Sequence, residues 1–166
     1  MLLNRRTLLA MGATGISSLL YSQTAGAEAD RVMRRVLPDW VIPDDLEAIV
    51  TKQEEWISDR WAPIRLVVMG ATIYHGRPIP LSWQIEFSPY CPEFEDANRR
   101  IAKSTGNEPD SYAWSELVLK MLQERGPEFV GQTHLEDTEL ATCVIWVESK
   151  AACKVLMELV WELIYR

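Results

Sequence analysis

The segment LSWQIEFS, residues 81–88, decides the fold. Its apolar and polar residues alternate strictly, and because successive side chains of a β-strand point to opposite faces, this pattern predicts a strand. The apolar positions are Leu81, Trp83, Ile85 and Phe87. A run of β-forming residues, 64–74, precedes this segment, and the Gly- and Pro-containing stretch HGRPIP (75–80) separates the two. We therefore expect a long antiparallel hairpin.

Segments of helical periodicity surround this hairpin. The predicted helices are 44–61, about 92–106, 110–126 and 149–166, and the further predicted strands are 129–135 and 142–147. The first helix would begin at Asp44 or Asp45, carry Ile57 on its apolar face and be flanked by Trp56 and Trp61. This order of elements predicts an α+β fold in two layers, with a small antiparallel or mixed sheet of about three or four strands and about four helices.

The N-terminal residues, 1–27, have the features of a cleavable export signal. Arg5 and Arg6 precede a short apolar stretch, and Ala25 and Ala27 stand where a signal peptidase would cut. The segment NRRTLL (4–9) resembles the bacterial twin-arginine signal. That resemblance covers only the leader and implies export of the protein to the periplasm, with no membrane anchor after cleavage.

The remaining chain is expected to consist of a tether over 28–43 and one domain over 44–166. Residues 28–166 contain 15 basic and 24 acidic residues, a net charge of −9. So negative a surface repels nucleic acid and anionic lipid, and it suits a partner protein with a basic surface.

Four polar residues cluster in the loop before the last predicted strand: His134, Glu136, Asp137 and Glu139. They form either a protein-contact surface or a solvated turn. In a third interpretation, His134, Glu136 and Asp137 bind a divalent metal or act as acid and base. The His-x-Glu spacing is a weak metal signal, because metal sites usually add a third ligand at a recognisable spacing.

Other candidate binding residues lie in predicted loops. His75 and Arg77 stand together in the hairpin loop and would suit an anion. Trp40 and Tyr90 are aromatic residues in loops, which makes them candidates for a protein-contact surface.

The three cysteines leave two interpretations open. In an oxidising compartment, Cys143 and Cys153 would form a disulfide between the last strand and the last helix. Alternatively, these two and Cys91 are buried free thiols, since free cysteine is among the residue types most often buried.

No motif of nucleophilic catalysis, phosphate binding, haem attachment or iron–sulfur ligation occurs in the sequence. The sequence therefore favours an exported, acidic, non-catalytic binding protein without a cofactor. In size, charge and its acidic loop it resembles bacterial immunity or inhibitor proteins, which implies action by protein–protein contact. The alternatives are a small periplasmic metal-binding protein or metalloenzyme that uses His134, and an accessory subunit of an exported redox complex.

Overall fold

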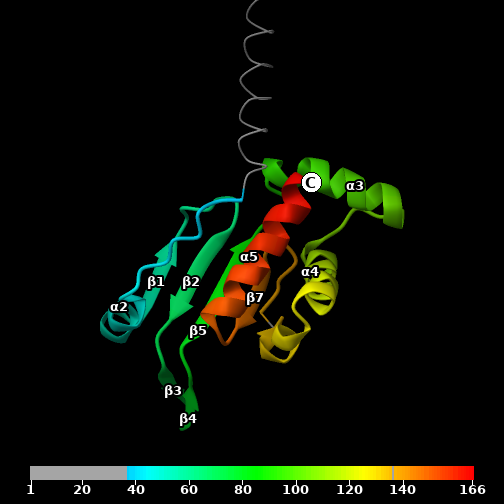
Figure 1. Ribbon diagram of the computed structural model, residues 1–166. Coiled ribbons are helices and arrows are strands. Elements are labelled where there is room, and N and C mark those ends of the chain that lie inside the picture. The colour runs from blue at the N-terminus through cyan, green and yellow to red at the C-terminus, as the bar shows by residue number, and fades with distance from the viewer. Residues whose placement is uncertain (1–36, 136) are drawn as a thin grey trace, which may run out of the picture. The chain divides into compact units, whose positions relative to one another are not determined.

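An antiparallel sheet of five strands forms one layer of the fold, and helices form the other (Figure 1). The computed structural model describes residues 37–135 and 137–166. The strands are β1 (Glu55–Ser58), β2 (Arg65–Met69), β5 (Ser82–Phe87), β6 (Thr133–His134) and β7 (Cys143–Val147), and they lie side by side in the order β1-β2-β5-β7-β6. The predicted α+β class is confirmed. The strand of this sheet that the prediction lacks is β1, and of the predicted strand over 129–135 only Thr133–His134 is a strand, because residues 127–132 form a 3-10 helix.

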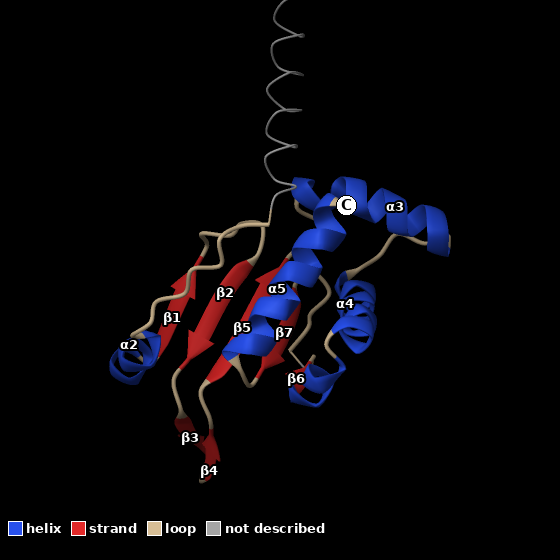
Figure 2. Ribbon diagram, viewed as in Figure 1, coloured by secondary structure: helices blue, strands red, loops and turns tan. Residues whose placement is uncertain are grey.

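The helices lie on one side of this sheet and at its ends (Figure 2). They are α2 (Leu46–Gln53), α3 (Glu95–Thr105), α4 (Ser111–Arg125) and α5 (Lys150–Tyr165), with the short 3-10 helices η1 (Pro92–Phe94) and η2 (Pro127–Gln132). Helix α5 packs on β5 and β7, and α4 packs on β7 and α5. Ser149 and Asp110 cap α5 and α4, because their side chains accept hydrogen bonds from backbone N–H groups of the first turn. Among the described residues, no helix is both long and apolar enough to span a membrane.

The predicted hairpin is confirmed, and it is longer than its two main strands. β2 and β5 continue into a second ribbon made of β3 (Thr72–Tyr74) and β4 (Arg77–Ile79), here called the arm (residues 72–79). The loop is shorter than predicted, because Arg77–Ile79 pairs with β3. Only His75 and Gly76 form the turn, and both have positive φ (48° and 75°), as a two-residue turn of type I′ requires.

Aromatic packing joins the sheet to the helices. The indole of Trp114 on α4 lies edge-on to Phe87 and Phe94, with ring centroids 5.8 and 5.1 Å away. Its Nε1 donates to Oδ1 of Asn98 at 2.8 Å, and Nδ2 of Asn98 donates to the Pro89 carbonyl at 2.7 Å. Trp114 is fully buried. Because Phe87, Phe94 and Asn98 belong to β5, η1 and α3, the side chain of Trp114 joins these three elements to α4.

Trp40 belongs to the core, and its predicted role as an exposed contact residue is wrong. It is only 8% exposed, and its ring lies 5.8 Å from both Trp61 and Trp161. Ile42 is also buried. Residues 37–43, predicted as the end of a tether, therefore pack as part of the compact unit Leu37–Arg166. The predicted leader and residues 28–36 lie outside the described residues.

The first predicted helix is correct only to Gln53. Glu54 adopts a positive φ of 71°, which ends α2, and the chain turns directly into β1. Helical periodicity placed Ile57 with the apolar face of α2, but pairing with β2 turns Trp56 toward the core and Ile57 to the opposite face of the sheet. Pairing with a neighbouring strand overrides local periodicity here.

Gly70→Ala is expected to lower the free energy of unfolding by about 1–3 kcal/mol, as overpacking typically does. Gly70 follows β2, and a Cβ atom added there would lie 2.7 Å from the backbone oxygen of Val50. Backbone cannot yield as a flexible side chain does. The matched control is Gly131→Ala, where no heavy atom lies within 4 Å of the new Cβ. Urea unfolding followed by tryptophan fluorescence measures both, and equal stability of the two variants would contradict the prediction.

Candidate functional site

The face of the sheet opposite α4 and α5, here called the open face, is the candidate site. Cross-strand pairing aligns one residue from each strand in a row across it: Ile57, Val67, Gln84, Trp146 and His134. The core residues of the same strands point the other way, toward the helices. Within the part of the chain that the structure describes, no helix packs on the open face.

The exposure of the side chains is uneven along this row. Val67 and Gln84 are each 7% exposed, so the centre of the face is closed to solvent. Ile57 is 48% exposed and Met69, which is also on this face, is 37% exposed, whereas Trp146 is half-buried. A folded monomer gains nothing from exposing such side chains together, and grouped exposed apolar residues mark interaction surfaces.

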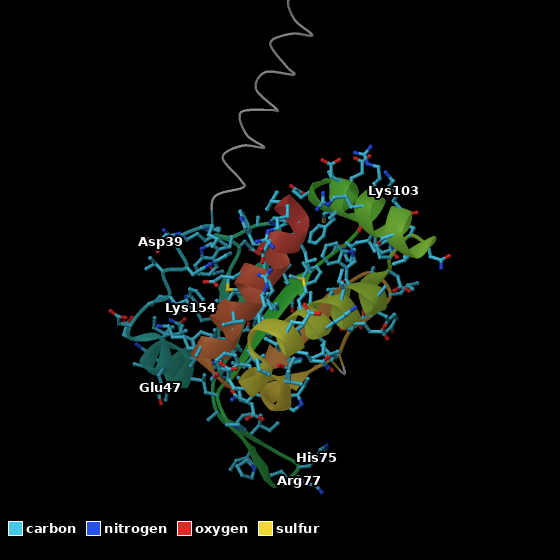
Figure 3. All side chains as sticks on the ribbon, turned by 45° about the vertical axis from the view of Figure 1, so that its right-hand side comes forward. Asp39, Glu47, His75, Arg77, Lys103 and Lys154 are labelled. Carbon is cyan, nitrogen blue, oxygen red and sulfur yellow. The ribbon has the colours of Figure 1, made fainter. Side chains whose placement is uncertain are left out.

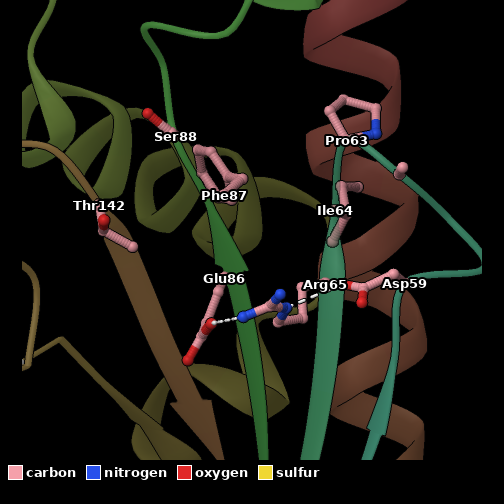
Figure 4. A pocket seen from close by; sticks show the side chains of 9 residues that line it. Asp59, Pro63, Ile64, Arg65, Glu86, Phe87, Ser88 and Thr142 are labelled. Atoms are coloured by element: carbon pink, nitrogen blue, oxygen red, sulfur yellow. Dashed lines mark hydrogen bonds and ion pairs between the residues drawn. The ribbon is translucent and has the colours of Figure 1, made fainter.

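Carboxylates border the row on one side, at the end of β1 and β2. Arg65 Nε donates to Asp59 Oδ1 at 2.8 Å, and Arg65 Nη1 lies 3.7 Å from Glu86 Oε2 (Figure 4). The hydrogen bond to Asp59 and the Asp59 charge raise the pKa of Arg65. These residues line a shallow depression of about 320 Å³ that also contacts Thr142. One guanidinium faces two carboxylates, so this border keeps a net negative charge.

The β6–β7 end of the open face holds the predicted loop residues. His134 Nε2 lies 3.3 Å from Glu148 Oε1, and Trp146 Nε1 donates to Asp137 Oδ2 at 2.5 Å. Glu55, opposite Met69, adds a further exposed carboxylate at the β1 end. The open face therefore presents apolar and aromatic side chains, interrupted by Gln84, between acidic borders. Aromatic anchors surrounded by charged residues are typical of protein–protein contact sites.

A buried hydroxyl cluster fixes the loop that carries Asp137. The Thr138 hydroxyl donates to the Val144 carbonyl at 3.0 Å and accepts from the Val144 N–H at 3.2 Å, so it satisfies backbone groups of β7 where β6 does not reach. It also lies 3.2 Å from the Ser115 hydroxyl on α4, which is 3.0 Å from Cys143 Sγ. Ser111 Oγ on the same helix donates to the Leu140 carbonyl.

Thr138→Val is expected to lower the free energy of unfolding by about 1–3 kcal/mol, because it leaves buried groups of Val144 without a partner. Valine keeps the shape of the threonine side chain, so the lost stability measures the contribution of the hydroxyl group and its hydrogen bonds. Thr142→Val is the control: Thr142 is half-buried, and its hydroxyl forms no hydrogen bond with any described residue. Thermal unfolding compares the two, and an equal loss in both variants would contradict the role assigned to Thr138.

The cysteines are free thiols in the structure. Cys143 and Cys153 are fully buried, and Cys91 is half-buried. Burial raises the pKa of both Cys143 and Cys153 to about 12, although hydrogen bonds with Ser115 and Thr138 oppose this shift at Cys143. Of the two alternatives for the cysteines, the disulfide between Cys143 and Cys153 is not formed in this structure.

The structure unites some predicted site residues and separates others. His134 and Asp137 meet around Trp146, whereas Glu136 lies outside the described residues and Glu139 is exposed in the same loop. The remaining candidates lie elsewhere: Tyr90 is 59% exposed in the turn after β5, and His75 and Arg77 lie at the tip of the arm (Figure 3). Within residues 37–135 and 137–166, no three His, Cys, Asp or Glu side chains gather to hold a metal ion.

Sequence reasoning missed most of the open face. The sequence places Ile57 and Met69 in apolar segments without indicating a surface role, and nothing in it connects Arg65 with Glu86, which form an ion pair in the structure. The one available signal was the polar half of 81–88, which includes Gln84 and Glu86 and marks a face turned away from the core. Which residues join them on that face depends on strand pairing.

Comparisons of the chain with protein-family models, curated proteins and solved structures gave no match. The assignment of a function therefore rests on the residues of the open face.

Proposed function

We propose that this protein is an acidic, non-catalytic binding protein that recognises another protein through its open face. The observation that carries the proposal is the row from Ile57 to His134, in which the apolar residues Ile57 and Trp146 are partly exposed and carboxylates lie on the borders. Trp146 and Ile57 supply apolar anchors, and Glu86 and Glu148 select basic residues around them.

The overall charge supports the same kind of partner. Residues 37–166 contain 22 acidic and 12 basic residues. Such an excess speeds association with a basic surface and slows association with an acidic one, both more strongly at low salt. The partner is therefore a protein with a basic surface around an apolar contact, and the protein acts as immunity and inhibitor proteins do, by occupying that surface.

Capture experiments with variants that introduce positive charges test this proposal. Ile57→Lys/Met69→Lys places two cations on the open face, and it is expected to lose a partner that the wild-type protein retains from an extract of its own host. Tyr112→Lys/Leu140→Lys introduces the same charges at residues that are 50% and 67% exposed outside the open face, and it should retain the partner. Retention by the first variant, loss by both, or no partner for the wild type would overturn the proposal.

Export of the protein is the second part of the proposal, and the leader over 1–27 supports it. We expect the protein isolated from the periplasm of its host to begin at Glu28, as intact-mass measurement would reveal. A cytosolic protein that begins at Met1 would contradict export, but it would leave recognition through the open face untouched.

A further inference from the structure

The outer edge of β1 is an unpaired strand edge. β1 lies at the end of the sheet and pairs only with β2. The N–H of Gly70 donates to the Glu54 carbonyl at 2.7 Å, which makes these two residues a hydrogen-bonded pair. Because such pairs alternate along an antiparallel ladder, Trp56 and Ser58 also bond toward β2. The N–H and C=O groups of Glu55 and Ile57 therefore point outward, and no described residue bonds them.

The side chains around this edge define what it can accept. Ile57 is 48% exposed and ends the apolar row of the open face, while Trp56 is half-buried on the core side. Glu54 and Glu55 are exposed at one end of the strand, and Asp59, which accepts a hydrogen bond from Arg65, lies at the other. Residues 39–59 contain seven acidic residues and one basic residue.

We propose that an extended, basic segment of the partner protein docks on β1 as an additional strand. This proposal rests on the proposed function and specifies how the partner binds. Main-chain hydrogen bonds to Glu55 and Ile57 would provide the affinity, as in other cases of strand addition. In the docked segment, apolar side chains would lie opposite Trp56 and Ile57, and Lys or Arg at both ends would pair with the acidic residues at the ends of β1.

A second copy of this chain fits the edge poorly. Pairing of two β1 strands would bring Glu54, Glu55 and Asp59 of each copy close together, and like charges opposite each other destabilise a strand pair. Exposed strand edges can pair with strands of other chains, and charged side chains on the edge commonly prevent pairing with a second copy because like charges repel. The acids therefore select a basic occupant.

Amide hydrogen exchange with a defined probe tests the proposal. The probe is a short peptide of valine and threonine with lysines at both ends, and its control is the same peptide with glutamates for the lysines. In the free protein, the Ile57 amide should exchange faster than those of Trp56 and Ser58. The lysine peptide should slow the Ile57 amide by about tenfold or more, which corresponds to one hydrogen bond, and the glutamate peptide should not.

Two variants of Ile57 and a methylated peptide separate main-chain docking from side-chain contact. Ile57→Pro removes the outward N–H but leaves the ladder to β2, and it should abolish binding of the lysine peptide, whereas Ile57→Thr should weaken it only a fewfold. If Ile57→Pro does not fold, a lysine peptide N-methylated at alternate residues gives the same test from the other side, because it lacks the N–H donors. Equal binding of methylated and unmethylated peptides would overturn the proposal.

Three other outcomes would also overturn it: equal slowing by the glutamate peptide, an Ile57 amide already slow without peptide, or slowing that depends on protein concentration alone. The last would identify a second copy as the occupant. Failure here and failure of the proposed function are distinguishable. If Ile57→Lys/Met69→Lys loses the partner but the lysine peptide does not protect the Ile57 amide, the proposed function stands and strand addition fails. If the peptide protects the amide but the variant retains the partner, strand addition stands and the proposed function fails.

Discussion

Trp114→Ala is expected to lower the free energy of unfolding by about 3–5 kcal/mol, the usual cost of removing a large buried aromatic side chain. Trp114 is fully buried and contacts the rings of Phe87 and Phe94. Its loss also leaves Oδ1 of the buried Asn98 without its indole donor. A loss of this size is a large fraction of the stability of an ordinary domain, so the variant should unfold at markedly lower urea concentration.

Two further variants divide this loss into its parts. Trp114→Phe keeps an aromatic ring but removes the donor to Asn98, and we expect it to lose about 1–3 kcal/mol. Tyr112→Ala, on the same helix at a residue that is 50% exposed, should change stability by no more than about 0.5 kcal/mol. If Trp114→Ala were no less stable than Tyr112→Ala, the cluster would not hold α4 on the sheet.

Alkaline pH is expected to destabilise the reduced protein steeply, because two buried thiols resist ionisation. Both Cys143 and Cys153 have a pKa raised from 9.0 to about 12 by burial. Below pH 9 the thiols are protonated in both states, so their contribution to stability is fully present. Between pH 9 and 12 only the unfolded chain releases these protons, and each thiol should lower the free energy of unfolding by about 1.4 kcal/mol per pH unit.

Urea unfolding of the reduced protein at a series of pH values measures this slope. Cys153→Ala should remove about half of the thiol contribution, and Cys143→Ala/Cys153→Ala should remove all of it, whatever these variants cost at neutral pH. Lysine and tyrosine titrations are common to all three proteins and cancel in the difference. Identical slopes for the wild type and the double variant would show that the thiols ionise equally well in the folded protein.

The sheet's main hairpin was predictable, because apolar and polar residues alternate without exception over 81–88 and a Gly- and Pro-containing stretch separates this segment from the β-forming run before it. Helices α4 and α5 were predictable for a similar reason: Asp110 and Ser149 are good caps, and apolar spacing continues after them. In these segments local propensity and tertiary packing agree.

β1 and Trp40 were not predictable, because the interactions that place them are distant in sequence. Nothing in the local sequence marks Glu54 as a residue of positive φ, and the spacing of Ile57 fits a helix as well as a strand. Trp40 lies in a proline-bounded segment without periodicity, and it is buried only because Trp61 and Trp161 meet it.

The candidate site was predictable in part. The acidic loop identified His134 and Asp137, and both lie at the open face. The row that joins them to Ile57 depends on the pairing of five strands, and a shift of one residue in any pair would place different side chains there. Similarly, the role of Thr138 follows from the point where β6 stops pairing with β7.

The arm has a consequence for protein engineering. Its strands keep the pairing register of β2 and β5, since Met69 lies opposite Ser82 and Thr72 opposite Ile79. Removing or adding residues in matched pairs around His75 and Gly76 would therefore change the length of the ribbon without moving any side chain of the sheet to the other face. The tip of the arm is a natural insertion point for a grafted epitope or a fluorescent label.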